Sequence, residues 1–130
     1  MRIPTILLAC VVLLLGAVGV QAEPPTGTWK INANGHEGEL VIDSVTDGKV
    51  EGTLLGDKIR GFYDEKSKCL SLIRLGADGN TKQTYKGYLF LNPEEKQTKY
   101  NLAGTFQVFG GEGGAGVEYG WYAHVTKAKE

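Results

Sequence analysis

The chain has 130 residues, with 14 basic and 15 acidic side chains and a formal net charge of −1. This near-neutral balance argues against a nucleic-acid-binding domain, which usually carries a stripe of lysine and arginine, and it provides no basic motif for anionic lipid. The length is sufficient for one domain with a single modest core.

The first 22 residues have the pattern of an export signal. Arg2 provides the positive start, residues 6–20 form an apolar run, and Val20-Gln21-Ala22 ends with the small residue that a signal peptidase requires. The run is shorter than the roughly 20 apolar residues of a membrane span. We therefore expect a single β-domain at residues 23–130 that is secreted or periplasmic after cleavage.

The expected cleavage separates the two cysteines of the chain. Cys10 leaves with the signal, so Cys69 has no partner and no internal disulfide can form. In an oxidising compartment such a cysteine is either buried or open to pairing between chains. Two alternatives for the N-terminus remain, namely a lipoprotein cleaved before Cys10 and an anchor that is retained.

Seven turn signals divide the remaining chain into eight predicted strands. Asn34-Gly35, Asp47-Gly48 and Asp78-Gly79 are typical of tight hairpins, which need a positive φ. The runs between the turns are rich in Val, Ile, Thr, Tyr and Phe, and most of them alternate. The predicted strands are 26–33, 37–45, 49–55, 58–64, 69–76, 82–91, 98–109 and 117–126.

Short connections predict an antiparallel meander, because strands joined by short turns lie side by side. A flat meander of eight strands would have two open edges and one apolar face in water. Closure into an all-β, eight-stranded up-and-down barrel removes both problems.

One short motif recurs on these strands: a glycine followed two positions later by a large apolar or aromatic residue. Glycine permits a kink and lets a bulky neighbour approach, and residues two positions apart lie on the same face of a strand. We therefore expect the large residue of each motif to point into the barrel. These residues are Trp29, Leu54, Tyr63, Leu89, Phe106 and Tyr122.

The interior of such a barrel has two interpretations, because eight strands enclose either packed side chains or one small ligand. A small, partly apolar molecule would need apolar walls with a few hydroxyl and ring N–H groups. The candidate ligand-binding residues are Trp29, Tyr63, Tyr85, Phe106, Tyr122 and His124. A bulge in the last strand would instead place Trp121 inside and His124 outside, and this alternative stays open.

The outer face offers the alternative function. Phe62, Tyr88 and Trp121 are expected there among charged residues, and exposed aromatic residues can mark a partner surface. With a filled barrel, the protein would be a protein-interaction or inhibitor module. Trp121 and the glycine-rich loop Gly110–Gly116 would form the contact.

No pattern indicates catalysis, a metal or a cofactor. The two histidines, His36 and His124, have no second histidine or cysteine at metal-ligand spacing. The loop Gly110–Gly116 lacks the Lys-Ser/Thr of a phosphate-binding loop. We expect a non-enzymatic protein with no nucleic-acid partner and no membrane contact in its mature form, and association into oligomers stays open.

Thr26-Gly27-Thr28-Trp29 resembles the first strand of the avidin and streptavidin group, and residues 47–54, 59–64 and 103–106 are similar in rhythm to later strands of that group. Gly27-Thr28-Trp29 also resembles the Gly-x-Trp signature of lipocalins. Both resemblances imply an eight-stranded up-and-down barrel with Trp29 at its floor. They imply no ligand, because Ile31 and Gly35 stand where avidins carry the asparagine and serine that bind biotin.

Overall fold

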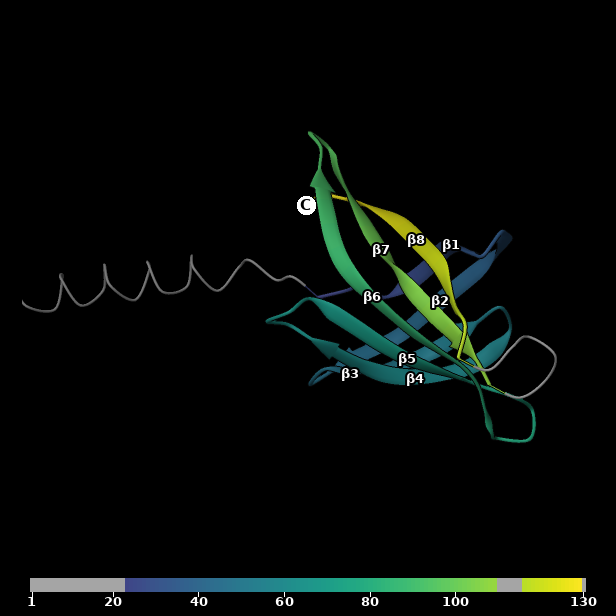
Figure 1. The fold of residues 1–130 in the computed structure, drawn as a ribbon. Helices are drawn as coiled ribbons and strands as arrows, with labels where there is room; N and C mark the ends of the chain where they lie inside the picture. The colour runs from purple at the N-terminus through teal and green to yellow at the C-terminus, as the bar shows by residue number, and fades with distance from the viewer. Residues whose placement is uncertain (1–22, 110–115, 130) are drawn as a thin grey trace, which may run out of the picture.

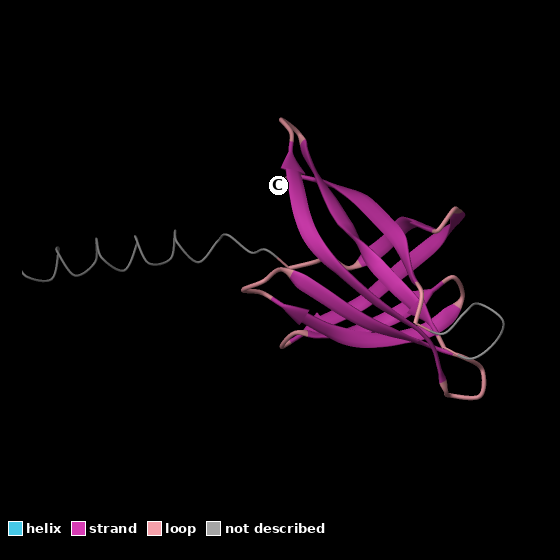
Figure 2. Ribbon diagram, in the orientation of Figure 1, coloured by secondary structure: helices cyan, strands magenta, loops and turns pink. Residues whose placement is uncertain are grey.

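Eight strands joined by short loops make up the described part of this computed structural model, residues 23–109 and 116–129 (Figure 2). Their bounds are β1 (Gly27–Ala33), β2 (His36–Thr46), β3 (Lys49–Leu54), β4 (Asp57–Asp64), β5 (Cys69–Leu75), β6 (Thr81–Pro93), β7 (Gln97–Val108) and β8 (Glu118–Ala128). The expected export signal and residues 110–115 of the glycine-rich loop lie outside the described residues. Within the described ranges, no helix is long and apolar enough to cross a membrane.

Each strand pairs antiparallel with the next one, and β8 pairs with β1, which closes the sheet (Figure 1). The predicted all-β, up-and-down barrel is therefore confirmed. The closing seam is short, because β1 and β8 pair only where Lys30–Ala33 meets Trp121–His124. By contrast, β6 and β7 pair from Gln83 to Pro93, and their hairpin extends beyond the neighbouring strands in Figure 1.

Two hairpin turns have the positive φ values that their sequences predict. Asn34 and Gly35 have φ values of 51° and 91°, and Asp47 and Gly48 have values of 52° and 82°. Two successive positive φ values are typical of the type I′ turn, whose twist matches that of the paired strands. The turn between β3 and β4 begins one residue earlier than predicted, with Leu55 at 50° before Gly56 at 86°.

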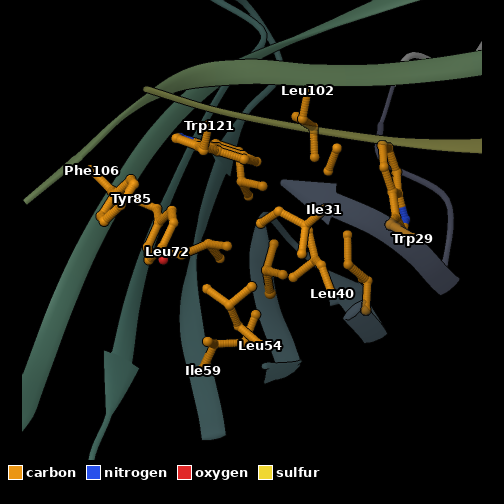
Figure 3. Close-up of a cluster of buried hydrophobic side chains, with 14 of the residues drawn as sticks. Trp29, Ile31, Leu40, Leu54, Ile59, Leu72, Tyr85, Leu102, Phe106 and Trp121 are labelled. Atoms are coloured by element: carbon orange, nitrogen blue, oxygen red, sulfur yellow. The ribbon is translucent and has the colours of Figure 1, made fainter. Parts of the chain in front are cut away.

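The core lies inside the barrel and includes five of the six residues that the glycine motif predicts to face inward. Trp29, Leu54, Tyr63, Leu89 and Phe106 are all 5 % exposed or less. Buried aliphatic residues from the same phase of the strands fill the space between them, among them Ile31, Leu40, Ile42, Val50, Ile59, Leu70, Leu72 and Leu102 (Figure 3). Each buried side chain of this size contributes about 1.5–3 kcal/mol, so the core holds the eight strands together.

The prediction that Tyr122 points into the barrel is wrong, and the alternative with Trp121 inside is confirmed, although β7 and β8 pair without a bulge. Tyr122 is 54 % exposed, whereas Trp121 and Ala123 are buried at 4 % and 1 %. Trp121 is therefore a core residue and not a surface contact, and the half-buried His124 shares the outward phase of Tyr122. Trp121 is buried because the space beside Gly87 accommodates its indole ring. An added Cβ at Gly87 would lie 2.5 Å from the indole Cζ2 of Trp121.

The N-terminal segment before β1 covers one end of the barrel. The indole N–H of Trp29 donates to the Pro25 carbonyl at 3.1 Å, and Pro24 is fully buried. Because antiparallel strands alternate in direction, the start of β1 and the end of β5 lie at opposite ends of the barrel. A buried arginine, Arg74, lies at that second end.

Candidate functional site

Tyr85 and Phe106, two of the predicted ligand residues, lie together inside the barrel. Their rings are stacked, with centroids 4.8 Å apart and planes 12° apart. Trp121 meets Tyr85 edge-on at a centroid distance of 5.6 Å, and Figure 3 shows the three rings beside Leu72. Such stacked and edge-to-face contacts stabilise aromatic rings against one another, so these residues act as core.

A polar plug, defined as Asp57, Arg74, Gln83 and Tyr85, lies at the end of the barrel where β5 ends. The Tyr85 hydroxyl donates to Gln83 Oε1 at 2.7 Å, and Arg74 Nη1 donates to the same oxygen at 2.9 Å. Arg74 Nε donates to Asp57 Oδ2 at 2.8 Å, and Arg74 Nη2 forms an ion pair with the same oxygen at 2.8 Å. A buried charge is tolerated only when it is paired and hydrogen-bonded, and the plug meets this condition.

The plug changes the acidity of two of its members. The hydrogen bond from Lys82, at 3.1 Å from Asp57 Oδ2, and those from Arg74 hold the pKa of Asp57 below its ordinary value. Burial raises the pKa of the Tyr85 hydroxyl, while the Arg74 charge acts against this rise. Both shifts favour the state in which Asp57 is charged and Tyr85 is neutral.

The six predicted ligand residues do not form one site. Tyr85 and Phe106 are together, but Trp29 lies on the far side of the core cluster from them in Figure 3. Tyr63 is buried on β4, and burial is the main cause that raises its pKa. Tyr122 and His124 belong to the outer phase of β8.

A groove of about 680 Å³ lies instead on the outer wall, across strands β3 to β8. Outward-phase side chains line it in two rows, each formed by residues that are directly opposite one another in the strand ladders. The inward-phase residues between the two rows also line it, namely Val50, Gly61, Leu72, Tyr85 and Phe106. We name the first row the cationic row; it consists of Lys49, Phe62, Ser71, Lys86 and Thr105. The second, the mixed row, consists of Glu51, Arg60, Ile73, Thr84, Gln107 and Glu118.

Short side chains make room in this part of the wall. Ser71, Thr84 and Thr105 lie on the middle strands β5 to β7, among the longer side chains of Lys86 and Gln107 on β6 and β7 and of Arg60 and Glu118 on β4 and β8. The ladder register brings these residues together, because adjacent strands are spaced about 4.8 Å apart and side chains on one face of a strand about 6.7 Å apart. The result is an elongated depression whose lining is more apolar than polar, with polar side chains along both rows.

The groove also has an apolar element and three cations, Lys49, Arg60 and Lys86, that form no ion pair among the described residues. Phe62 is 53 % exposed, so its ring is available on the wall. Both ion pairs among the described residues involve Asp57, and neither Lys49 nor Lys86 takes part in them. In the mixed row, Gln107 Nε2 donates to Glu118 at 3.3 Å, so this carboxylate already has a hydrogen-bond partner.

A second outer surface borders the cationic row on its side towards the β6–β7 turn. Tyr88, Phe90 and Tyr122 are 49 %, 51 % and 54 % exposed. Ala103 of β7 lies opposite Tyr88 on one side and Tyr122 on the other. We name these four residues the aromatic wall. The half-buried Cys69 is in the same row, opposite Tyr88.

The described residues contain no group of three or more His, Cys, Asp or Glu side chains that could hold a metal ion. Comparison of the chain with known protein families, with curated proteins and with solved structures gave no match. The likeness to avidins and lipocalins therefore depends on the Gly-Thr-Trp motif and the strand rhythm alone.

Proposed function

We propose that the chain is an exported, non-enzymatic binding protein that holds a small, partly apolar molecule in the outer groove. Export is supported by the signal-like pattern of the first 22 residues. Binding on the wall, and not in the interior, is supported by one observation above all. The inward residues form a continuous buried cluster, whereas a hollow of about 680 Å³ is lined mainly by outward-phase side chains.

The properties of the groove suit a small ligand. Its volume is within the roughly 300–1,000 Å³ of typical ligand sites. Phe62 supplies an apolar surface, and Ser71, Thr84 and Thr105 supply hydroxyl groups that can orient a bound molecule. This combination of one exposed ring and a few polar groups is typical of sites that bind amphipathic molecules.

The test uses residues 23–130 and the neutral fluorescent dye Nile red. We expect Phe62→Ala to weaken dye binding between about twofold and tenfold, because one aromatic contact is lost. Phe90→Ala is the matched control, since Phe90 has a similar exposure but lies outside the groove. Equal dye affinity of the two variants would argue against the groove as the site.

A second candidate function is self-association through the aromatic wall, which now replaces Trp121 as the surface candidate. The row Tyr88–Ala103–Tyr122 has a small residue between two tyrosines and no charge. A second copy related by a two-fold axis along β7 would place each Tyr88 against Tyr122 of the partner subunit. The three half-exposed rings supply about 300 Å² of aromatic surface, against roughly 800 Å² per partner in a standard interface, so the dimer would be weak.

Cysteine cross-linking tests this arrangement. In a Cys69→Ser background, Ala103→Cys should give a disulfide-linked dimer under mild oxidation, because the axis passes over this position. Lys58→Cys, on the outer face of β4, is the control and should remain monomeric. Equal cross-linking of the two variants, or none in either, would contradict the arrangement.

A further inference from the structure

We infer that the ligand of the outer groove is an amphipathic anion, with an aromatic or short apolar part on Phe62 and a carboxylate bound by Lys86. This inference depends on the proposed function, since it names the chemical class of the molecule in the same groove.

The charges of the two rows differ. The cationic row contains Lys49 and Lys86 and no acidic residue, while the mixed row contains two acids and one arginine. Glu51 is directly opposite Arg60, and Glu118 accepts a hydrogen bond from Gln107. The acids of the mixed row therefore have neighbouring donors, whereas the ammonium groups of the cationic row have no acidic partner among the described residues.

The ladder register sets the length of the ligand. Phe62 and Lys86 are separated by one residue, Ser71, and thus by two strand spacings or about 9.6 Å between backbones. A lysine side chain can reach back over part of this distance. A ring on Phe62 and a carboxylate two or three carbons away would therefore meet both groups, with the Ser71 hydroxyl between them as a further donor.

The position of Lys86 on the wall is fixed by the core beneath it. The indole N–H of Trp121 donates to the Lys86 carbonyl at 3.2 Å and to the Thr105 carbonyl at 3.1 Å. The backbone that carries Lys86 and Thr105 is therefore held from inside the barrel. A cationic ligand would meet two unpaired ammonium groups in this row, and a neutral ligand would leave them unused.

Three probes of nearly equal shape test the charge: 3-phenylpropionate, 3-phenylpropan-1-ol and 3-phenylpropylamine. Their affinities for residues 23–130 are measured by NMR titration. We expect the acid to bind at least threefold more tightly than the alcohol, and the amine to bind most weakly. Lys86→Gln should reduce the affinity for the acid about two- to fivefold and leave that for the alcohol unchanged. Lys58→Gln is the matched control, because Lys58 is exposed on β4 outside the groove.

The outcomes separate this inference from the proposed function. If acid and alcohol bind equally, or the amine binds best, the anion inference is overturned. If all three fail to bind, the inference is also overturned, but the proposed function survives provided that Phe62→Ala still weakens Nile red binding. If Phe62→Ala does not weaken Nile red binding, the anion inference and the proposed function are both overturned. A Lys86→Gln protein with an unchanged NMR fingerprint excludes misfolding as the cause of a reduced affinity.

Discussion

The indole ring of Trp121 occupies the space beside Gly87 of β6, where a Cβ would lie 2.5 Å from the indole Cζ2. Gly87 is directly opposite Gly104 of β7, so two positions without side chains lie next to each other under the ring. Because the indole N–H also donates to carbonyls of both strands, the ring fastens β8 to its neighbour β7 and to β6 beyond it, on the inside of the barrel.

Gly87→Ala should therefore destabilise the protein. The added methyl group would have to displace the indole or the Ala103 carbonyl, which lies 3.0 Å away, and such overpacking costs about 1–3 kcal/mol. Urea unfolding of residues 23–130 measures this loss. Gly120→Ala is the matched control on β8, because nothing lies within 4 Å of its added Cβ; a similar loss in both variants would refute the packing argument.

Asp57→Asn should remove a pH-dependent part of the stability. The pKa of Asp57 is lowered in the folded state, first by the Lys82 hydrogen bond and then by Arg74. The carboxylate therefore stabilises the fold above its unfolded pKa of about 3.9, and this contribution is lost as the pH falls through the folded value. The difference in free energy of unfolding between the wild type and Asp57→Asn should be largest above pH 5 and should shrink towards pH 3. A constant difference across this range would contradict the ion pairing, and Glu95→Gln in an exposed turn provides the control.

Tyr85→Phe should change how the free energy of unfolding depends on pH in the alkaline range. At pH 7 the variant loses the hydrogen bond to Gln83, a cost of about 1 kcal/mol. Burial raises the pKa of Tyr85 above the ordinary value of 10.0, so the neutral hydroxyl favours folding below this value and its contribution is lost as the pH rises through the folded pKa. Urea unfolding at pH 7 and at pH 10–11 should show the gap between the wild type and the variant narrowing. A gap that widens would show that the hydroxyl does not resist ionisation.

Tryptophan fluorescence should distinguish a ligand on the wall from one in the interior. Trp121 binds the backbone of two groove residues, whereas Trp29 lies on the far side of the core cluster. A ligand in the groove should change the emission of a Trp29→Phe protein, in which Trp121 is the remaining tryptophan. Trp121→Phe should lose most of this response. The reverse pattern would indicate binding near Trp29, and circular dichroism of both variants checks that the barrel is intact.

Much of the architecture is predictable because turn chemistry and strand alternation are local properties. Asn34-Gly35 and Asp47-Gly48 give the hairpins directly, and the glycine motif identifies five buried residues correctly. In β8 the same reasoning fails, because Gly120 precedes two adjacent aromatic residues and alternation alone cannot decide which one is buried. The deciding factor is the space beside Gly87, which lies on another strand.

The groove could not be found from the sequence for a related reason. Each of its residues is ordinary on its own: Lys49, Phe62 and Lys86 are solvent-facing positions of separate strands. Only the register across several ladders makes them neighbours. A shift of one residue in any pairing would move the side chains of that strand to the opposite face of the sheet. The polar plug is hidden in the same way, since Asp57 and Arg74 are 17 positions apart.

The burial of Pro24 limits how many N-terminal residues can be removed without damage to the barrel. The buried Pro24 is only two residues after the expected cleavage site, and the Pro25 carbonyl accepts a hydrogen bond from the Trp29 indole N–H. Removal of the chain up to and including Pro25 would therefore expose the Trp29 end of the barrel to water, even though every strand remained complete.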